Sequence, residues 1–280
     1  MAVVEVTGLV RRYGEFTAIR DLELRVDEGE CVAILGPNGA GKTTTIEILE
    51  GYRRRDGGTV SVLGLDPAHP SRAWRQRIGI VAQSSNDLTD ATVREAVAHF
   101  GRCYSSPRGV DETIELVGLD DKATSRVGRL SGGQRRRLDV ALGVVGRPEL
   151  LFLDEPTTGF DPEARHVFWQ LIEQLKAEGV TVLLTTHYLE EADALADRVV
   201  VIAQGVKVAD TTPRDLGMRS AGEVLVRWAE AGESREERTT TPTTLVATLA
   251  ARFGGEVPHL EVVRTTLEQA YLELIDRSEP

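Results

Sequence analysis

Short apolar runs alternate with amphipathic stretches along most of the chain, and this alternation predicts the fold class. Strands are expected at residues 3–10, 22–26, 31–35, 57–64, 77–83, 149–156, 180–187 and 198–203. Helical periodicity is expected at residues 43–52, 110–119, 134–146, 162–179 and 188–197. Because most of these strands are apolar throughout and helices separate them, we expect an α/β protein with a largely parallel sheet.

Between about residues 84 and 148 the pattern is helical alone, which predicts an inserted helical subdomain. Thr92 and Glu95 have the spacing of a capping box, so a helix is expected to begin there. Asp111 is the expected N-cap of the next helix, and Ser131 could cap a third helix that stops before Pro148.

The composition changes near Gly217, and the rest of the chain predicts a small α+β module of unknown role. Its expected parts are a strand at 223–229, a charged turn at 230–238, a helix at 242–255, a strand at 260–264 and a last helix at 266–275. The expected domains are therefore residues 1–217 and 218–280.

The segment ILGPNGAGKTTT, residues 34–45, lies between a predicted buried strand and a predicted helix. Gly36, Gly41, Lys42 and Thr43 fit the pattern of a phosphate-binding loop. Glycines let backbone N–H groups approach an anion closely, and the start of the helix adds partial positive charge. Lys42 can meet the β- and γ-phosphates and Thr43 can hold Mg²⁺. A glycine-rich turn that binds nothing is the alternative, but the order of strand, loop and helix favours a nucleoside triphosphate.

Two further segments carry groups suited to phosphate chemistry. The buried strand LLFLDE ends in Asp154, which can hold Mg²⁺, and Glu155, which is placed to orient or deprotonate a water. A helix-capping turn would also explain this pair of acids. The segment LSGGQ, residues 130–134, puts a hydroxyl and two glycines at a helix N-terminus, which is a second candidate anion site.

Three single residues carry weaker signals. Gln83 and His187 each end a predicted strand, where Gln83 could ligate Mg²⁺ and water and His187 could contact a γ-phosphate. Taken alone, a surface amide and a structural histidine explain them better. Tyr13 is likewise more often a packing aromatic than a residue that stacks on a base.

Composition and charge limit the partners. A net charge of −11 without a basic stripe argues against nucleic acid as the main partner. The only two cysteines, Cys31 and Cys103, lack metal-ligand spacing and fit a reduced cytosolic protein. The N-terminus does not read as a signal peptide, and no apolar run approaches the ~18 residues that span a bilayer. Action at a membrane would thus require another chain to cross it.

Together these segments resemble the ATP-binding-cassette (ABC) ATPases over residues ~2–215. The motifs follow the family's order: Tyr13, Walker A from Gly36, Gln83, the signature LSGGQ, Walker B ending in Asp154 and Glu155, Asp161 within TTGFD, and His187. LSGGQ followed about twenty residues later by LFLDEP is very specific to this family. The segments LSGGQRRRLDVALGVVGRP and TTHYLEEADALADR look like the drug-resistance branch of bacterial ABC exporters, although Gln269-Ala270-Tyr271 departs from a tail common there.

The resemblance implies a P-loop NTPase (RecA-like) core with an N-terminal antiparallel β subdomain and an inserted α-helical signature subdomain. It implies ATP and Mg²⁺ as ligands, with Glu155 as general base and His187 as γ-phosphate clamp. The other ATP contacts would be Tyr13 on adenine and, around the phosphates, Gly36, Pro37, Asn38, Gly39, Ala40, Gly41, Lys42, Thr43 and Thr44. Thr43, Gln83 and Asp154 would serve Mg²⁺, and Gln83 the attacking water as well.

The resemblance also implies the assembly. Ser131, Gly132, Gly133 and Gln134 would bind the ATP held by the opposite subunit, and Asp161 would lie at the dimer interface. One Walker A and one signature per chain then require a homodimer with two composite sites.

The leading hypothesis is the ATPase subunit of a bacterial exporter at the cytoplasmic face of the cell membrane. A separate permease would carry a drug or another hydrophobic compound. The alternative is a soluble ABC ATPase that acts on ribosomes or DNA, although the chain has neither a second cassette nor heptads for a coiled-coil insert. LSGGQ all but excludes a plain P-loop kinase or GTPase.

Overall fold

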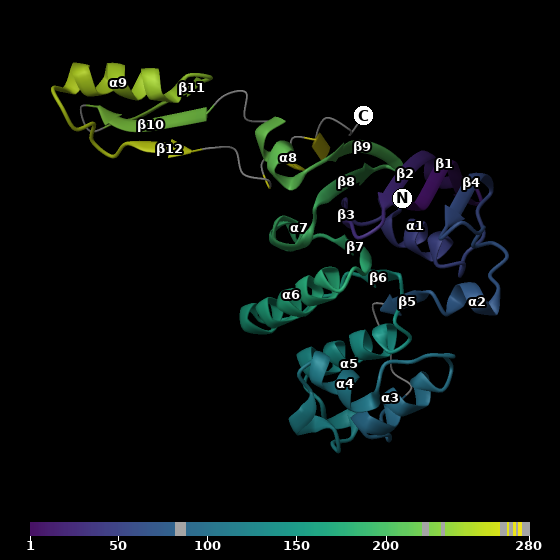
Figure 1. Ribbon diagram of the computed structural model, residues 1–280. Helices are drawn as coiled ribbons and strands as arrows, with labels where there is room; N and C mark the ends of the chain where they lie inside the picture. The colour runs from purple at the N-terminus through teal and green to yellow at the C-terminus, as the bar shows by residue number, and fades with distance from the viewer. Residues whose placement is uncertain are drawn as a thin grey trace. The chain divides into compact units, whose positions relative to one another are not determined.

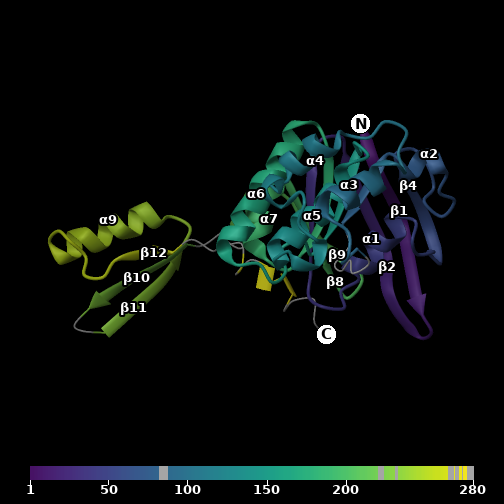
Figure 2. The same ribbon diagram turned by 90° about the horizontal axis from the view of Figure 1, so that it is seen from below.

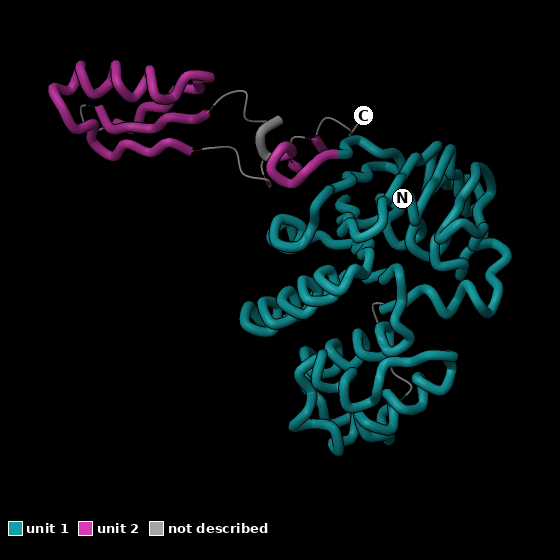
Figure 3. The backbone as a smooth tube through the Cα atoms, viewed as in Figure 1, with its two compact units in different colours: residues 1–210 teal, residues 211–280 magenta. Residues whose placement is uncertain are grey.

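The computed structural model describes residues 1–81, 88–219, 224–230 and 233–263, with residues 268, 271, 272, 274 and 275. Its contacts divide the chain into two compact units, Met1–Asp210 and Thr211–Pro280 (Figure 3). The domain boundary expected near residue 217 stays a prediction. Among the described helices, none combines the length and the apolar character needed to cross a bilayer.

The first unit contains a six-stranded sheet in the order β5-β6-β7-β3-β8-β9 (Figure 1). Its strands are β3 (Cys31–Leu35), β5 (Ile78–Val81), β6 (Leu150–Asp154), β7 (Thr181–Thr186), β8 (Arg198–Ala203) and β9 (Val206–Thr211). The first five of the order, β5 to β8, pair in parallel, which confirms the predicted α/β sheet. β9 follows β8 after only Gln204 and Gly205, whose φ angles of 49° and 80° suit a tight hairpin turn.

The three central strands of the parallel sheet are fully buried, and this agrees with their apolar sequences. Every residue of β3, β6 and β7 is buried, as expected where helices cover both faces of a parallel sheet. Helices α1 (Lys42–Leu49), α6 (Pro162–Ala177) and α7 (Leu189–Leu195) follow these three strands in the chain. Ile46 of α1 lies in one core cluster with Phe152 and Leu183 of the sheet.

An antiparallel sheet accompanies the parallel one, as the predicted fold class requires. It has the order β2-β1-β4, from β1 (Ala2–Tyr13), β2 (Phe16–Asp27) and β4 (Gly57–Val62), and Figure 2 shows the three strands side by side. Val4, Leu22 and Val60 belong to the same core cluster as Ile46, so the two sheets share a core. The short helix α2 (Arg72–Arg75) adds buried Trp74, whose indole N–H donates to the carbonyl of Val62 at 2.8 Å.

The chain between β5 and β6 is helical in its described part, and Figure 1 shows these helices gathered in one lobe of the first unit. They are α3 (Val93–Gly101), α4 (Val110–Leu116) and α5 (Gly132–Val144), with short 3₁₀ turns η1 (Asp120–Lys122) and η2 (Val127–Arg129). The capping box of Thr92 and Glu95 is confirmed.

The predicted cap at Asp111 is wrong. Gly109 is the N-cap of α4, and its N–H donates to the carboxylate of Glu112 at 3.2 Å. Asp111 lies in the first turn instead, where it pairs with Arg94 at 2.6 Å. Asp111 and Glu112 both lie in the first turn of α4, and either carboxylate could accept a hydrogen bond from a free backbone N–H there. Glu112 is the acid that accepts it, from Gly109.

The second unit holds α8 (Pro213–Arg219), β10 (Val224–Glu230), β11 (Glu233–Thr239), α9 (Pro242–Phe253) and β12 (Glu261–Val263). Figures 1 and 2 both show α9 along one face of the sheet β11-β10-β12, where Val226, Trp228 and Leu249 form a small core. The charged turn predicted at 230–238 is wrong, because most of it is strand β11. Half of the helix predicted at 266–275 lies outside the described residues, and the five residues that are described there are helical.

Candidate functional site

Three adjacent strands bring the predicted site residues to one edge of the parallel sheet. β3 leads into Gly36, β6 ends at Asp154 and leads into Glu155, and β7 leads into His187. Since β6, β7 and β3 are neighbours and parallel, the segments that follow them meet at the carboxyl edge. That edge is where open α/β sheets bind ligands.

The loop from Gly36 to Gly41 needs its glycines. Gly39 and Gly41 have φ angles of 79° and 103°, which side chains other than glycine rarely adopt. A Cβ on Gly41 would lie 2.6 Å from the carbonyl of Ala18, and one on Gly36 would lie 2.2 Å from the carbonyl of Ile202. Gly41 then caps α1 without any side-chain hydrogen bond, so the first N–H groups of the helix point at the loop and suit an anion.

Lys42 begins α1 and lies inside this loop, with 5% of its surface exposed. Its Nζ donates to the carbonyls of Gly36 at 2.8 Å and Pro37 at 3.2 Å. Burial lowers the pKa of Lys42, while the charges of Glu155 and Asp154 oppose that change. The ammonium is therefore held close to both acids at the place where the loop would cradle phosphates.

Asp154 and Thr43 are the described residues that fit Mg²⁺. Asp154 is 8% exposed and accepts a short hydrogen bond from the hydroxyl of Thr185 on β7. A carboxylate and a hydroxyl are oxygen ligands, and Mg²⁺ commonly takes few protein ligands and completes its shell with phosphates and water. No cluster of three or more His, Cys, Asp or Glu side chains that could hold a metal ion occurs among the described residues. Gln83 lies outside the described residues.

Glu155 has a strained backbone. Its φ of 43° lies in the left-handed region, which costs about 1–2 kcal/mol for a residue with a Cβ. Its N–H is shared between the carbonyl and the hydroxyl oxygen of Thr185, at 3.1 Å each. Strain that a structure holds in place is common at functional sites.

His187 meets Glu155 across the ends of β7 and β6. Its Nδ1 lies 3.5 Å from Oε2 of Glu155, and its ring centroid lies 4.1 Å from that of Tyr188. The imidazole is 39% exposed whereas the glutamate side chain is 16% exposed. The histidine therefore sits at the open side of the carboxylate, where it can reach a bound group.

One pocket of about 220 Å³ joins the phosphate loop to Tyr13 and Glu155. Its lining residues are Tyr13, Phe16, Ala18, Asn38, Gly39, Gly41, Lys42, Thr43, Thr44 and Glu155. The hydroxyl of Tyr13 lies 3.5 Å from that of Thr44. Guanidinium groups of Arg11 and Arg53 lie 4.8 and 5.4 Å from the centre of the tyrosine ring, which fixes that ring at the rim.

The signature residues line a different pocket, of about 380 Å³. Its lining residues are Ser131, Gly133, Gln134, Arg137, Asp161, Glu163, Ala164 and Val167. Ser131 caps α5, and its N–H in turn donates to the side chain of Gln134 at 3.0 Å. Asp161 caps α6 by accepting from the N–H of Ala164 at 2.8 Å. The structure thus collects the predicted residues into two groups, and the two pockets share no lining residue.

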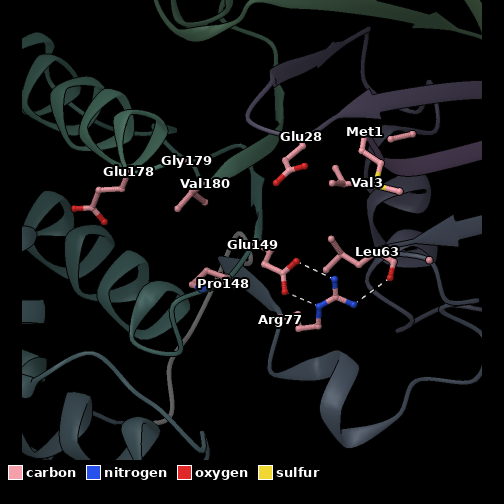
Figure 4. A pocket seen from close by; sticks show the side chains of 12 residues that line it. Met1, Val3, Glu28, Leu63, Arg77, Pro148, Glu149, Glu178, Gly179 and Val180 are labelled. Carbon is pink, nitrogen blue, oxygen red and sulfur yellow. Dashed lines mark hydrogen bonds and ion pairs between the residues drawn. The ribbon is translucent and has the colours of Figure 1, made fainter.

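A cavity of about 500 Å³ lies at the opposite edge of the parallel sheet (Figure 4). Residues just before the strands line it, including Glu28, Arg77, Glu149 and Val180. Arg77 pairs with Glu149 through two contacts, of 2.5 and 2.8 Å, as the dashed lines in Figure 4 show. None of the predicted site residues lines this cavity, so it is separate from the candidate site.

Sequence reasoning missed several residues that support the site. Thr185 contacts both Asp154 and Glu155, but a threonine in an apolar strand carries no signal. Arg136 donates to the carbonyls of Asp154 and Pro156, yet it stands in a run of three arginines with nothing to set it apart.

Comparisons with known proteins agree with this geometry. The sequence profile of the family described as "ABC transporter" matches residues 19–158. The "Nod factor export ATP-binding protein I" of Burkholderia lata is 42% identical over 221 residues, which cover 77% of this chain and 73% of that protein. The protein of the same name from Ralstonia nicotianae is 44% identical over 220 residues, covering 76% of this chain and 68% of the relative.

Solved structures agree as well. An ATP-binding cassette of an ABC transporter in its ADP conformation superposes with a TM-score of 0.68 at 26% identity, covering 75% of this chain and 91% of that one. A bacterial Atm1-family ABC exporter with ATP bound gives a TM-score of 0.69 at 27% identity, covering 78% of this chain and 40% of that one. With its phosphate loop, paired acids and signature helix, the chain belongs to the ABC transporter family and is a nucleotide-binding ATPase.

Proposed function

We propose that this ATPase is the energy-coupling subunit of a bacterial membrane exporter. The observation that carries the proposal is the meeting of the phosphate loop, Asp154, Glu155 and His187 at one sheet edge, in a chain similar to subunits named for Nod factor export. Hydrolysis of ATP would drive a separate permease, and the cargo would be a drug or another hydrophobic compound. The protein would then lie at the cytoplasmic face of the cell membrane.

In this proposal each polar group has a defined role. Lys42 and the loop N–H groups would hold the β- and γ-phosphates, and Thr43 and Asp154 would hold Mg²⁺, which would neutralise phosphate charge when bound. Gln83 would assist the metal and the water. Glu155 accepts a proton from the attacking water, and His187 contacts the γ-phosphate beside it. The distance of 3.5 Å between His187 and Glu155 supports their action on the same group.

Two copies of the chain would complete each site. The signature pocket at Ser131 shares no lining residue with the pocket at Lys42, which supports the proposal that they are two half-sites. A two-fold dimer would place each signature pocket on the partner's ATP, and it would bury Asp161 nearby. ATP would then join the protomers and hydrolysis would release them.

Ser131→Arg should spare ATP binding to the monomer and block dimerisation. Ser131 is exposed at the mouth of its pocket, and an arginine would fill the space meant for the partner's γ-phosphate. Loss of the cap costs about 1 kcal/mol, which a folded variant should tolerate. Nucleotide fluorescence and size-exclusion chromatography in ATP measure the two effects. Thr124→Arg, at an exposed position of the same subdomain, is the control, and a Ser131→Arg protein that still dimerises would refute the composite site.

A groove of about 470 Å³ beside β5 is the surface that we assign to the permease. Tyr52 and Ile80 line it and are 80% and 41% exposed, which leaves apolar surface open to a partner. Glu50 also lines it, and burial, with the charges of Asp154 and Glu47, raises the pKa of its carboxyl to about 8. A permease segment with an apolar anchor and a hydrogen-bond acceptor would match both features, because a carboxyl with a pKa of about 8 is mostly protonated near pH 7 and can donate.

Tyr52→Ala should weaken permease binding at least ~10-fold, because aromatic anchors dominate such interfaces. The measurement is recovery of a polytopic membrane protein from detergent extracts, with tagged ATPase as bait. Leu65→Ala removes another exposed side chain, 46% exposed and outside the groove, and should have no effect. Wild-type protein that is recovered on ribosomes or DNA rather than with a polytopic membrane protein would instead support the soluble alternative.

A further inference from the structure

Helix α5, which begins with the signature residues, also makes hydrogen bonds to the backbone around Glu155. Arg136 lies on α5, two residues after the last signature residue, Gln134, and is 7% exposed. Its Nε donates to the carbonyl of Pro156 at 2.9 Å, and its Nη2 donates to the carbonyl of Asp154 at 2.9 Å. These carbonyls belong to the residues on either side of Glu155.

The chemistry of arginine suits this task. A planar guanidinium presents donors in a fixed fork, so two bonds fix the direction of the groups that accept them. Burial lowers the pKa of Arg136, but a guanidinium stays charged in proteins, and charged donors make the stronger hydrogen bonds. Thr185 holds the N–H of Glu155, so the peptide groups around this residue are fixed from both β7 and α5.

We propose that Arg136 is a positioning residue, which holds the Glu155 carboxylate in the geometry for hydrolysis and ties it to the orientation of α5. The inference rests on the proposed role of Glu155 as general base. Ser131 at the start of α5 faces the partner's ATP in the proposed dimer, so Arg136 would connect the half-site that binds that nucleotide with the half-site that hydrolyses its own.

The neighbouring arginine shows that the contact is particular to one position. Arg137 donates to the carbonyls of Val117 and Gly118, at 3.2 and 2.8 Å, both within the helical subdomain. Two consecutive arginines on one helix therefore bind different segments, and Arg136 is the one that reaches the loop of Glu155.

Arg136→Met tests the proposal in the full-length protein. We expect kcat for MgATP hydrolysis to fall at least tenfold, with KM and the affinity for a fluorescent ATP analogue within twofold of wild type. Arg108→Met is the matched control, because Arg108 is also largely buried and pairs with Glu112 and Glu178 away from the site. Its kcat should stay within twofold of wild type, which separates loss of positioning from loss of any buried arginine.

A double variant with Glu155→Gln decides how Arg136 acts. If Arg136 works only through the carboxylate of Glu155, adding Arg136→Met should leave the residual hydrolysis of Glu155→Gln unchanged. A fall by the same factor in both backgrounds would overturn the proposal, as would an Arg136→Met kcat within twofold of wild type.

Should Arg136→Met fail to fold, by thermal unfolding, Arg136→Gln takes its place. Its side chain is shorter and has its two N–H donors on one nitrogen, whereas Arg136 uses Nε and Nη2. We therefore expect kcat to fall at least threefold with nucleotide affinity retained, and an unchanged kcat would overturn the proposal. Absence of hydrolysis by the wild-type protein would instead count against the proposed function.

Discussion

Glu155→Gln should slow MgATP hydrolysis by roughly 10²-fold or more and leave nucleotide affinity near its wild-type value. The amide is nearly the same size as the carboxylate, and Lys42, Thr43 and Asp154 remain to hold the nucleotide and metal. The change removes the carboxylate that we propose as the base for the attacking water. It also removes a negative charge from the pocket proposed to receive the γ-phosphate.

Loss of that charge predicts a second effect. With less repulsion beside the γ-phosphate and little hydrolysis, the ATP-bound dimer of Glu155→Gln should persist where the wild-type dimer is faint. Phosphate release measures the first effect, and size-exclusion chromatography in ATP measures the second. Glu149→Gln is the control, since this acid precedes the same strand at the opposite edge of the sheet.

The outcomes of this experiment distinguish the possible causes. Hydrolysis near the wild-type rate would show that the base lies elsewhere. Slow hydrolysis without a dimer would mean either damaged ATP binding or a dimer that needs its permease. Nucleotide affinity of the same variant, with and without the permease, distinguishes these two.

The central sheet and the ends of its strands were predictable because a strand that is buried on both faces has a continuous run of apolar residues. CVAIL and LLFLD are apolar up to the residue where each strand ends, and all of these residues are buried. The residues after such strands had to meet at one edge once the sheet was parallel. The phosphate loop and the acids were therefore expected to lie together, whereas His187 was assigned to the same site only through the resemblance to ABC ATPases.

Strand β11 was missed for the opposite reason. Six of its seven residues are exposed, so its sequence ESREERT shows no alternation of apolar and polar positions. Its pairing depends on β10 and on cross-strand contacts such as Arg227 with Glu236, at 3.2 Å. Charges along a sheet edge also discourage further pairing, which makes such a strand resemble a turn in sequence.

The residues that support the site were unpredictable because their roles depend on tertiary contacts. Successive residues on a helix point about 100° apart, so Arg136 and Arg137 face different segments despite identical chemistry. Only the packing of α5 against the loop after β6 selects Arg136. Sequence patterns identified the groups proposed to touch ATP but not those that hold them in place.

Lys42→Ala should reduce kcat/KM for ATP by at least ~10³-fold, the largest loss that we expect from a single substitution. The loop would keep its N–H groups but lose the cation against the β- and γ-phosphates, so ATP binding should weaken together with the chemical step. Glu155→Gln should keep its affinity, and this difference separates a phosphate-binding residue from a base.

The Lys42→Ala experiment needs two controls. Lys42 is buried and donates to the carbonyls of Gly36 and Pro37, so thermal unfolding must first show that the variant is folded. Lys122→Ala removes a lysine that pairs with Asp121 far along the chain, and its phosphate release should match that of wild type. A folded Lys42→Ala protein that kept more than half of the wild-type activity would rule out Lys42 as the phosphate-binding cation. The loop from Gly36 to Gly41 would then have to bind ATP through its backbone N–H groups alone.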